Sequence, residues 1–275
     1  MSAEPRGPAS ADSYADIAEW YDLEHDGFSD DIEMLNELLA GARERLAVLE
    51  VGAGSGRLLA ALAAAGHTVV GVEPSAAMRA RCAKRLAALP ERVARRARIV
   101  EGKATALNLP DDERFDLALM GLGAFCHLTS AAERHTALRL LYERLKIGGM
   151  LLLDVDLSGP RRLLESAGRL WWQGSWRAGE DGALIVSHTI TGAPGREMGT
   201  VEVTHLYDAH EQGGPLRRTL AVTSLALLAR GEVELAVRHA GFTDITIYGG
   251  YDLSPADDQS PRAIVVAHLP HSRPL

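Results

Sequence analysis

A glycine-rich segment between an apolar run and a helical pattern constrains the fold of this sequence more than any other feature. The run from Val48 to Val51 leads into Gly52-Ala53-Gly54-Ser55-Gly56, and an amphipathic pattern begins at Arg57. Glycines at alternate positions permit a tight turn whose backbone approaches a ligand closely, and free N–H groups at the start of a helix favour such binding. The segment therefore predicts a strand, a ligand-binding loop and a helix, as in an α/β sheet.

The charged residues near this loop indicate which ligand it binds. Glu73 ends the next apolar run, where a carboxylate can accept hydrogen bonds from both hydroxyls of a ribose. A nicotinamide dinucleotide fingerprint would place a glycine where this chain has Arg57, and Glu50 would repel a pyrophosphate. A ligand with an ammonium and a sulfonium would instead be attracted by Glu50, and S-adenosylmethionine is such a ligand.

Short apolar runs alternate with amphipathic segments from residue 46 onward, which is typical of a parallel sheet covered by helices. The runs are nearly continuous in leucine and β-branched residues, as strands buried on both faces require. Strands are expected at 46–51, 68–72, 98–100, 115–121, 150–155, 243–248 and 263–267. Helices are expected at 57–65, 75–89, 130–146 and 231–240.

Residues 158–230 break this rhythm. Alternating patterns at 183–190, 199–207 and 217–227 predict an inserted antiparallel sheet, interpreted as a cap or lid. Trp171, Trp172 and Trp176 precede these strands, and their large apolar area suits either packing within the cap or the wall of an acceptor pocket.

The expected domain organisation follows from these changes of pattern. Residues 1–11 are too polar to repay the entropy of ordering and are expected to form a disordered tail. Residues 12–157 would form the N-terminal helices and the cofactor-binding core, 158–230 the cap, and 231–275 the C-terminal part of the core.

Composition excludes several classes of function. The chain has 37 acidic against 29 basic residues, a net charge of -8, so neither nucleic acid nor an anionic membrane is an expected partner. Cys82 and Cys126 are the only cysteines and lack metal-ligand spacing, which favours a reducing compartment and no metal site. No apolar stretch reaches the ~20 residues of a membrane span, so we expect a cytoplasmic protein.

Four segments match the motifs of one known family. They are Glu50 to Gly56, Val72 to Met78, Phe115 to Ala118, and Leu145 to Met150, and residues 231–267 match its terminal helix and reversed hairpin. On these residues the chain resembles class I S-adenosylmethionine-dependent methyltransferases. The resemblance implies a Rossmann-like, doubly wound sheet of seven strands, mostly parallel with a terminal antiparallel strand, plus the inserted antiparallel cap. It also implies S-adenosylmethionine as cofactor and S-adenosylhomocysteine as product.

Within this family the inserted sheet resembles that of small-molecule methyltransferases of bacterial secondary metabolism, including amino-sugar N-methyltransferases. Ala18 to Asp22 resembles their Tyr-Asp element, which closes over the cofactor, and Gly123 to Leu128 resembles the loop where they hold a histidine facing the acceptor. The resemblance implies methyl transfer to an oxygen or nitrogen atom of a small-molecule acceptor, by a monomer or homodimer.

The matched motifs also imply the site residues. The positions expected to bind the cofactor are Tyr21, Glu50, Gly52, Ala53, Gly54, Gly56, Glu73, Pro74, Met78, Ala104, Gly121 and Leu122. His127 is the expected general base, with Tyr21 as its helper, although either side chain could instead serve packing. Trp171, Trp172 and Trp176 are the candidates for acceptor binding.

One departure from the family pattern concerns the adenine. The family usually has Gly-Asp-Ala after the third strand, with the acidic side chain on the adenine amino group, but this chain has Gly102-Lys103-Ala104. Lysine has no acceptor atom, so adenine recognition must use backbone groups near Ala104 or another side chain.

The sequence is also compatible with two other functions, because a fold does not fix a function. One is a protein that binds S-adenosylmethionine without transferring methyl, either a cyclase-like pathway enzyme or a regulator. The other is a nicotinamide-dependent oxidoreductase.

Overall fold

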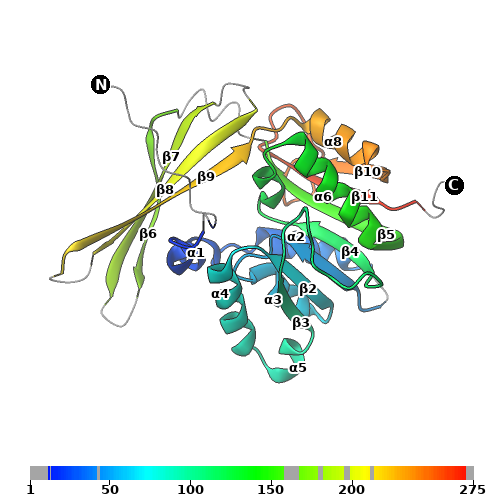
Figure 1. Cartoon of the computed structure of the whole chain (residues 1–275), viewed down its shortest axis with the longest axis horizontal. Helices are drawn as coiled ribbons and strands as arrows, with labels where there is room; N and C mark the ends of the chain where they lie inside the picture. The colour runs from blue at the N-terminus through cyan, green and yellow to red at the C-terminus, as the bar shows by residue number, and fades with distance from the viewer. Residues whose placement is uncertain are drawn as a thin grey trace.

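The chain forms two separate β-sheets, a large one flanked by helices and a small one that projects to the side (Figure 1). The computed structural model describes residues 12, 14–41, 44–157, 167–178, 182–194, 199–210 and 214–270. The expected tail at 1–11 and the start of the expected cap at 158–166 lie outside these residues.

The large sheet has seven strands in the order β10-β11-β5-β4-β1-β2-β3. They are β1 (Ala47–Val51), β2 (Thr68–Glu73), β3 (Ala97–Glu101), β4 (Phe115–Met120), β5 (Leu145–Asp156), β10 (Thr243–Tyr248) and β11 (Arg262–His268). Strands β1 to β5 pair in parallel, whereas β11 runs antiparallel to β5 and β10 antiparallel to β11. This confirms the predicted sheet, and it brings the carboxyl ends of β1, β2 and β4 to one edge, where ligands of open α/β sheets bind.

Both faces of this sheet are buried, which explains why its strands lack polar alternation. Leu49 belongs to an apolar cluster with Leu138 of α6 (Ala131–Arg144) and Val237 of α8 (Arg230–His239). Its neighbour Val48 belongs to a second cluster with Met34 of α2 (Asp30–Leu39) and Leu59 of α3 (Arg57–Ala65). Consecutive side chains of β1 thus enter opposite cores.

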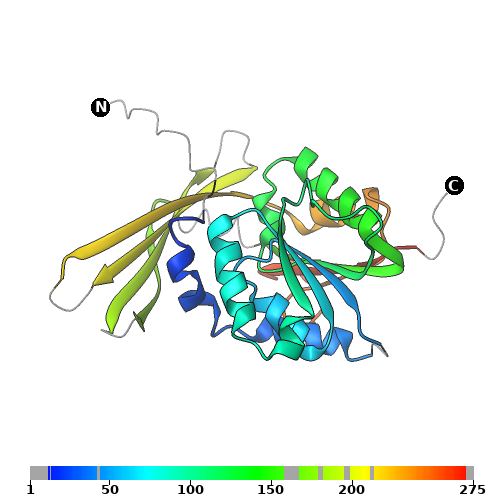
Figure 2. The same ribbon diagram turned by 60° about the horizontal axis from the view of Figure 1, so that its bottom comes forward.

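Most of the helices cover the two faces of this sheet, and α1 lies between it and the small sheet (Figure 2). The bounds are α1 (Ala18–His25), α2 (Asp30–Leu39), α3 (Arg57–Ala65), α4 (Ala76–Ala87), α5 (Glu91–Ala94), η1 (Ala124–His127), α6 (Ala131–Arg144) and α8 (Arg230–His239). None of the described helices is long and apolar enough to span a bilayer.

The small sheet is antiparallel, in the order β6-β7-β8-β9. Its strands are β6 (Leu170–Ala178), β7 (Ala183–Pro194), β8 (Thr200–His210) and β9 (Leu216–Ala226). The last three were predicted, whereas β6 is an additional edge strand that contains the three tryptophans. One face packs on α1 and the turn before it, in a cluster formed by Ile17, Trp20, Ile185, Tyr207, Ala209 and Ala221.

Candidate ligand-binding and active site

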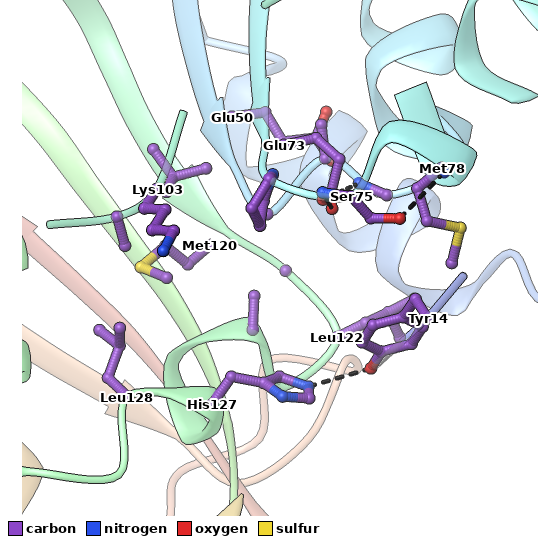
Figure 3. Close-up of a pocket in the computed structure, with 18 of the residues that line it drawn as sticks. Tyr14, Glu50, Glu73, Ser75, Met78, Lys103, Met120, Leu122, His127 and Leu128 are labelled. Atoms are coloured by element: carbon purple, nitrogen blue, oxygen red, sulfur yellow. Dashed lines mark hydrogen bonds between the residues drawn. The ribbon is translucent and has the colours of Figure 1, made fainter. Parts of the chain in front are cut away.

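A cavity of about 500 Å³ lies at the carboxyl ends of β1, β2 and β4, as the sheet topology predicts. Its walls come from the glycine loop after β1, the ends of β2 and β4, the loop after β3, η1, and the segment that contains α1 (Figure 3). Segments far apart in the sequence therefore meet around one space.

The glycine loop adopts backbone conformations that other residues avoid. Gly52, Gly54 and Gly56 have φ angles of +79°, +56° and +81°. A Cβ atom on Gly54 would meet no protein atom within 4 Å, whereas a Cβ on Gly56 would overlap Cys82 of α4. Gly54 therefore faces the cavity, while Gly56, which does not line it, allows α4 to pack against the loop.

Glu73 fixes the shape of this loop from the end of β2. The Gly54 N–H donates to Glu73 Oε2 at 2.9 Å, and the Ser75 N–H donates to Oε1 at 2.8 Å. Burial raises the pKa of Glu73 above its usual value. Each carboxylate oxygen keeps a further lone pair, so Glu73 can still accept hydrogen bonds from a ligand.

Glu50 is a buried carboxyl group with an unsatisfied oxygen. Only 3% of Glu50 is exposed, and its Oε2 has no hydrogen-bond partner in the described part of the chain. Burial raises the pKa of Glu50 to about 8, although the positive charge of Arg57 acts in the opposite direction. The residues present fit a ligand that brings a positive group to Glu50, because an unpaired polar atom is costly to bury.

Arg57 does not satisfy Glu50 Oε2, although its own Nε also has no hydrogen-bond partner among the described residues. Its guanidinium forms an ion pair with Asp31 of α2 and donates to the Phe28 carbonyl oxygen at 2.8 Å. The charge of Arg57 is therefore largely matched by Asp31, and the same contacts fix α2 beside the glycine loop.

His127 ends η1 and reaches the opposite side of the cavity. Burial lowers the pKa of His127 to about 4, so its imidazole is neutral at pH 7. Tyr14 Oη and His127 Nε2 share a hydrogen bond of 3.1 Å, in which the donor depends on the ring tautomer. Burial raises the pKa of Tyr14, so its hydroxyl keeps its proton.

Tyr21, the expected helper of His127, also lines the cavity but occupies a different position. Its ring stacks on His25 with centroids 4.0 Å apart and meets the edge of Tyr14 at 5.9 Å. The hydroxyl that contacts His127 is that of Tyr14. Tyr14 and Tyr21 are seven residues apart, so a helical pattern places both on one side. This spacing is the sequence feature that could have indicated Tyr14 as a site residue.

The loop after β4 is held by a polar cluster around Asp154, whose partners Tyr251 and Arg262 lie far along the sequence. Leu122 has a φ of +46°, and its N–H donates to Asp154 Oδ2 at 3.0 Å. The same carboxylate is buried, accepts from Tyr251 Oη at 2.6 Å and forms an ion pair with Arg262. These contacts stabilise an unfavourable backbone conformation at a position that lines the cavity.

Residues 49–151 match the family model described as a methyltransferase domain. Over these residues the chain is similar to methyltransferase domains. The matched region contains the glycine loop, Glu73 and His127, whereas Tyr14 and the small sheet lie outside it.

Comparison with known proteins gives relatives of similar sequence over about half of the chain. An uncharacterized methyltransferase of Bacillus licheniformis is 36% identical over 130 residues, which cover 47% of this chain and 56% of that protein. The match thus spans little more than half of that relative.

Solved methyltransferase structures share the fold over nearly the whole chain. The CcbJ methyltransferase of Streptomyces caelestis has a TM-score of 0.77 and 22% identity, with 94% of this chain and 98% of that chain covered. The sugar N-methyltransferase KedS8 of a Streptoalloteichus species has a TM-score of 0.73 and 20% identity, with 98% and 99% covered.

Most of the residues expected to bind the cofactor line the cavity. Those that line it are Tyr21, Glu50, Gly52, Ala53, Gly54, Glu73, Pro74, Met78, Ala104, Gly121 and Leu122. Lys103 is exposed at its rim beside Thr105, whose hydroxyl can both donate and accept. Gly56 is the expected residue that packs elsewhere.

The three tryptophans are not brought to this cavity. They lie on β6, and none of them is among its lining residues. The side of the cavity near His127 is instead lined by Leu128, Thr129, Glu133 and Ser224. Ser224 belongs to β9, so among the described strands of the small sheet it is β9 that reaches the cavity.

Proposed function

We propose that this protein is an S-adenosylmethionine-dependent methyltransferase that acts on an oxygen or nitrogen atom of a small molecule. The observation that carries the proposal is Glu50, a buried carboxyl group whose Oε2 lacks a partner in the described chain, on the same cavity as Glu73 and Gly54. Such a cavity suits a ligand with a positive group and vicinal hydroxyls. The similarity to methyltransferase domains and the similar fold of the sugar N-methyltransferase KedS8 support the reaction class.

The residues that would hold the cofactor divide by chemistry. Glu50 would pair with the ammonium group of the cofactor, and Glu73 would accept hydrogen bonds from its ribose hydroxyls. Gly54 leaves space for the cofactor because it has no side chain. Ala104 and Thr105 would meet the adenine, with the Thr105 hydroxyl as an available acceptor. When bound, the cofactor supplies a methyl group already activated on a sulfonium, so the protein mainly positions the acceptor.

His127 would contact the acceptor, and Tyr14 would position His127. The hydrogen bond between Tyr14 Oη and Nε2 fixes the orientation of the imidazole ring, and the low pKa keeps the ring neutral at physiological pH. A neutral imidazole can accept a hydrogen bond from an amine or hydroxyl, but a pKa near 4 makes it a weak base. Orientation of the acceptor is therefore its main contribution.

Cofactor affinity should depend on pH through Glu50. The folded protein without ligand holds a proton on Glu50 below a pH of about 8, while a ligand ammonium requires the ionised carboxylate. Affinity for S-adenosylhomocysteine should therefore rise from pH 6 to pH 8, by up to about tenfold per pH unit, with release of a proton. Calorimetry in two buffers of different ionisation enthalpy measures both quantities. Glu50→Gln should bind more weakly and without this dependence, and a pH-independent wild type would contradict the assignment.

Replacing Glu73 by alanine should weaken cofactor binding more than turnover. The variant loses the ribose contacts and both bonds that shape the loop. We expect a loss of about 1.5–3 kcal/mol in binding S-adenosylhomocysteine, with turnover at saturating cofactor changed little. Normal affinity with collapsed turnover would argue against the ribose role.

The direct test of the function is product formation. The protein is incubated with S-adenosylmethionine and a panel of amino sugars and hydroxylated small molecules, and S-adenosylhomocysteine and methylated products are measured by mass spectrometry. Product from any of these acceptors supports the proposal. Tight S-adenosylmethionine binding without transfer would favour a non-transferring binder, and retention of a nicotinamide nucleotide would favour an oxidoreductase.

A further inference from the structure

The order of the strands indicates which end of the cavity meets the base of a nucleoside ligand, an argument that rests on the proposed function. In such a ligand the amino acid chain and the base leave the ribose on opposite sides. With the chain at Glu50 on β1 and the ribose at Glu73 on β2, the base points toward β3, the next strand in the sheet. The lining residues that follow β3 are Lys103, Ala104 and Thr105.

The loop after β3 is closed by its own backbone. The Lys103 N–H donates to the Ala106 carbonyl oxygen at 3.0 Å, and the Ala106 N–H donates to the Lys103 carbonyl oxygen at 2.9 Å. Both backbone groups of Lys103 are thus used within the turn. What Lys103 can offer to a ligand is therefore its side chain.

The ammonium group of Lys103 is free to bind a ligand. Arg57 also lines the cavity, but its charge is matched by Asp31. Lys103 is exposed and forms no ion pair with any residue that the structure describes. An ammonium has three hydrogen-bond donors and no acceptor, so this end of the cavity presents a strong donor.

Apolar side chains complete this end of the cavity. Met120 ends β4 and Leu128 follows η1, and Figure 3 shows both on the same side of the cavity as Lys103. Apolar walls with a few polar groups are typical of sites for small organic ligands. The faces of a planar base would lie against the apolar side chains, and its edge would meet the Lys103 ammonium and the Thr105 hydroxyl.

The edge of a purine farthest from the ribose carries the substituent on C6, which ring nitrogens flank. Adenine has an amino group there, which donates, whereas a 6-oxo purine has an oxygen, which accepts. The Lys103 ammonium can donate to a ring nitrogen or to a 6-oxygen, but it has no acceptor for a 6-amino group. The Thr105 hydroxyl can pair with either substituent, because it both donates and accepts.

We propose that the cavity binds 6-oxo purine nucleosides at least as tightly as the corresponding adenosine compounds, and that Lys103 determines this specificity. The ligands are purine nucleosides that carry a homocysteine or methionine chain. A carboxylate in place of Lys103 would reverse the preference, because it accepts from a 6-amino group and is repelled by a 6-oxygen. The base specificity of this site is therefore set by one exposed side chain.

Calorimetry with S-adenosylhomocysteine and its 6-oxo analogue, S-inosylhomocysteine, tests this proposal without reference to turnover. Both ligands have the same ribose and amino acid chain, so the contributions of Glu50 and Glu73 cancel in the ratio of the two dissociation constants. The wild type should bind S-inosylhomocysteine at least as tightly as S-adenosylhomocysteine. Lys103→Asp should prefer S-adenosylhomocysteine by about tenfold or more. Lys84→Ala is the matched control and should keep the wild-type ratio, because Lys84 is an exposed lysine of α4 that does not line the cavity.

Thermal melts report whether each variant is folded. If Lys103→Asp does not fold, Lys103→Met removes the ammonium but keeps most of the stem, and it should shift the ratio toward S-adenosylhomocysteine by about threefold or more. A wild type that binds S-adenosylhomocysteine more tightly, or a folded Lys103→Asp variant with the wild-type ratio, would overturn this inference alone. A wild type that binds neither ligand would overturn the proposed function and this inference with it.

Discussion

Replacing Gly54 by valine is expected to abolish binding of S-adenosylhomocysteine while the protein remains folded. No protein atom lies within 4 Å of where a Cβ on Gly54 would stand, so the new side chain fills cavity space. The φ of +56° adds a strain of about 1–2 kcal/mol, which should lower the melting temperature by several degrees. Overlap with the ligand should weaken binding by about 100-fold or more. Calorimetry and a thermal melt measure the two effects separately.

Gly56→Val is the matched control for this prediction. Its φ is also positive, but its Cβ would overlap Cys82 in the packed interior instead of entering the cavity. This variant should lower the melting temperature more than it lowers the affinity for S-adenosylhomocysteine. Undiminished affinity in a folded Gly54→Val protein would remove the glycine loop from the binding site.

His127→Ala is expected to reduce turnover by about 10²-fold or more while cofactor affinity stays unchanged. His127 lies across the cavity from Glu50 and Glu73, so its loss should affect the acceptor alone (Figure 3). In the wild type, protonation removes the one lone pair of the neutral ring, so turnover should fall as pH falls through about 4. Initial rates between pH 4 and pH 8, together with ligand titrations, test this.

Tyr14→Phe separates positioning from direct contact. It removes the hydroxyl that shares a hydrogen bond with His127 Nε2 but keeps the ring, so turnover should fall by about tenfold or less. Unchanged turnover in His127→Ala would exclude His127 from the reaction. A parallel loss of melting temperature and of all binding would instead assign His127 to packing.

The features that sequence predicts well here are those encoded locally. The glycine loop, Glu50 and Glu73 lie within one β-α-β unit, and the apolar strands are buried on both faces, so pattern and structure agree. β6 escaped prediction because its tryptophans and glycine do not alternate in polarity, and its side chains are largely exposed.

Contacts between distant segments could not be predicted. Asp154 contacts Tyr251 and Arg262 only because β11 pairs with β5. In the sequence, the whole small sheet lies between these two strands. The partnership of Tyr14 with His127 likewise depends on where the segment before α1 crosses the cavity. A single sequence contains no periodic signal for either contact.

The way α1 is attached has a consequence for how ligands enter. Ile17 and Trp20 pack into an apolar cluster with Tyr207 of the small sheet, whereas Asp22 is joined to α4 by ion pairs with Arg81 and Arg85. Salt screens such partly exposed pairs but leaves apolar packing intact. Raising ionic strength should therefore weaken the attachment of α1 to α4, while its packing on the small sheet persists. Ligand dissociation would then accelerate with salt while the melting temperature barely changes.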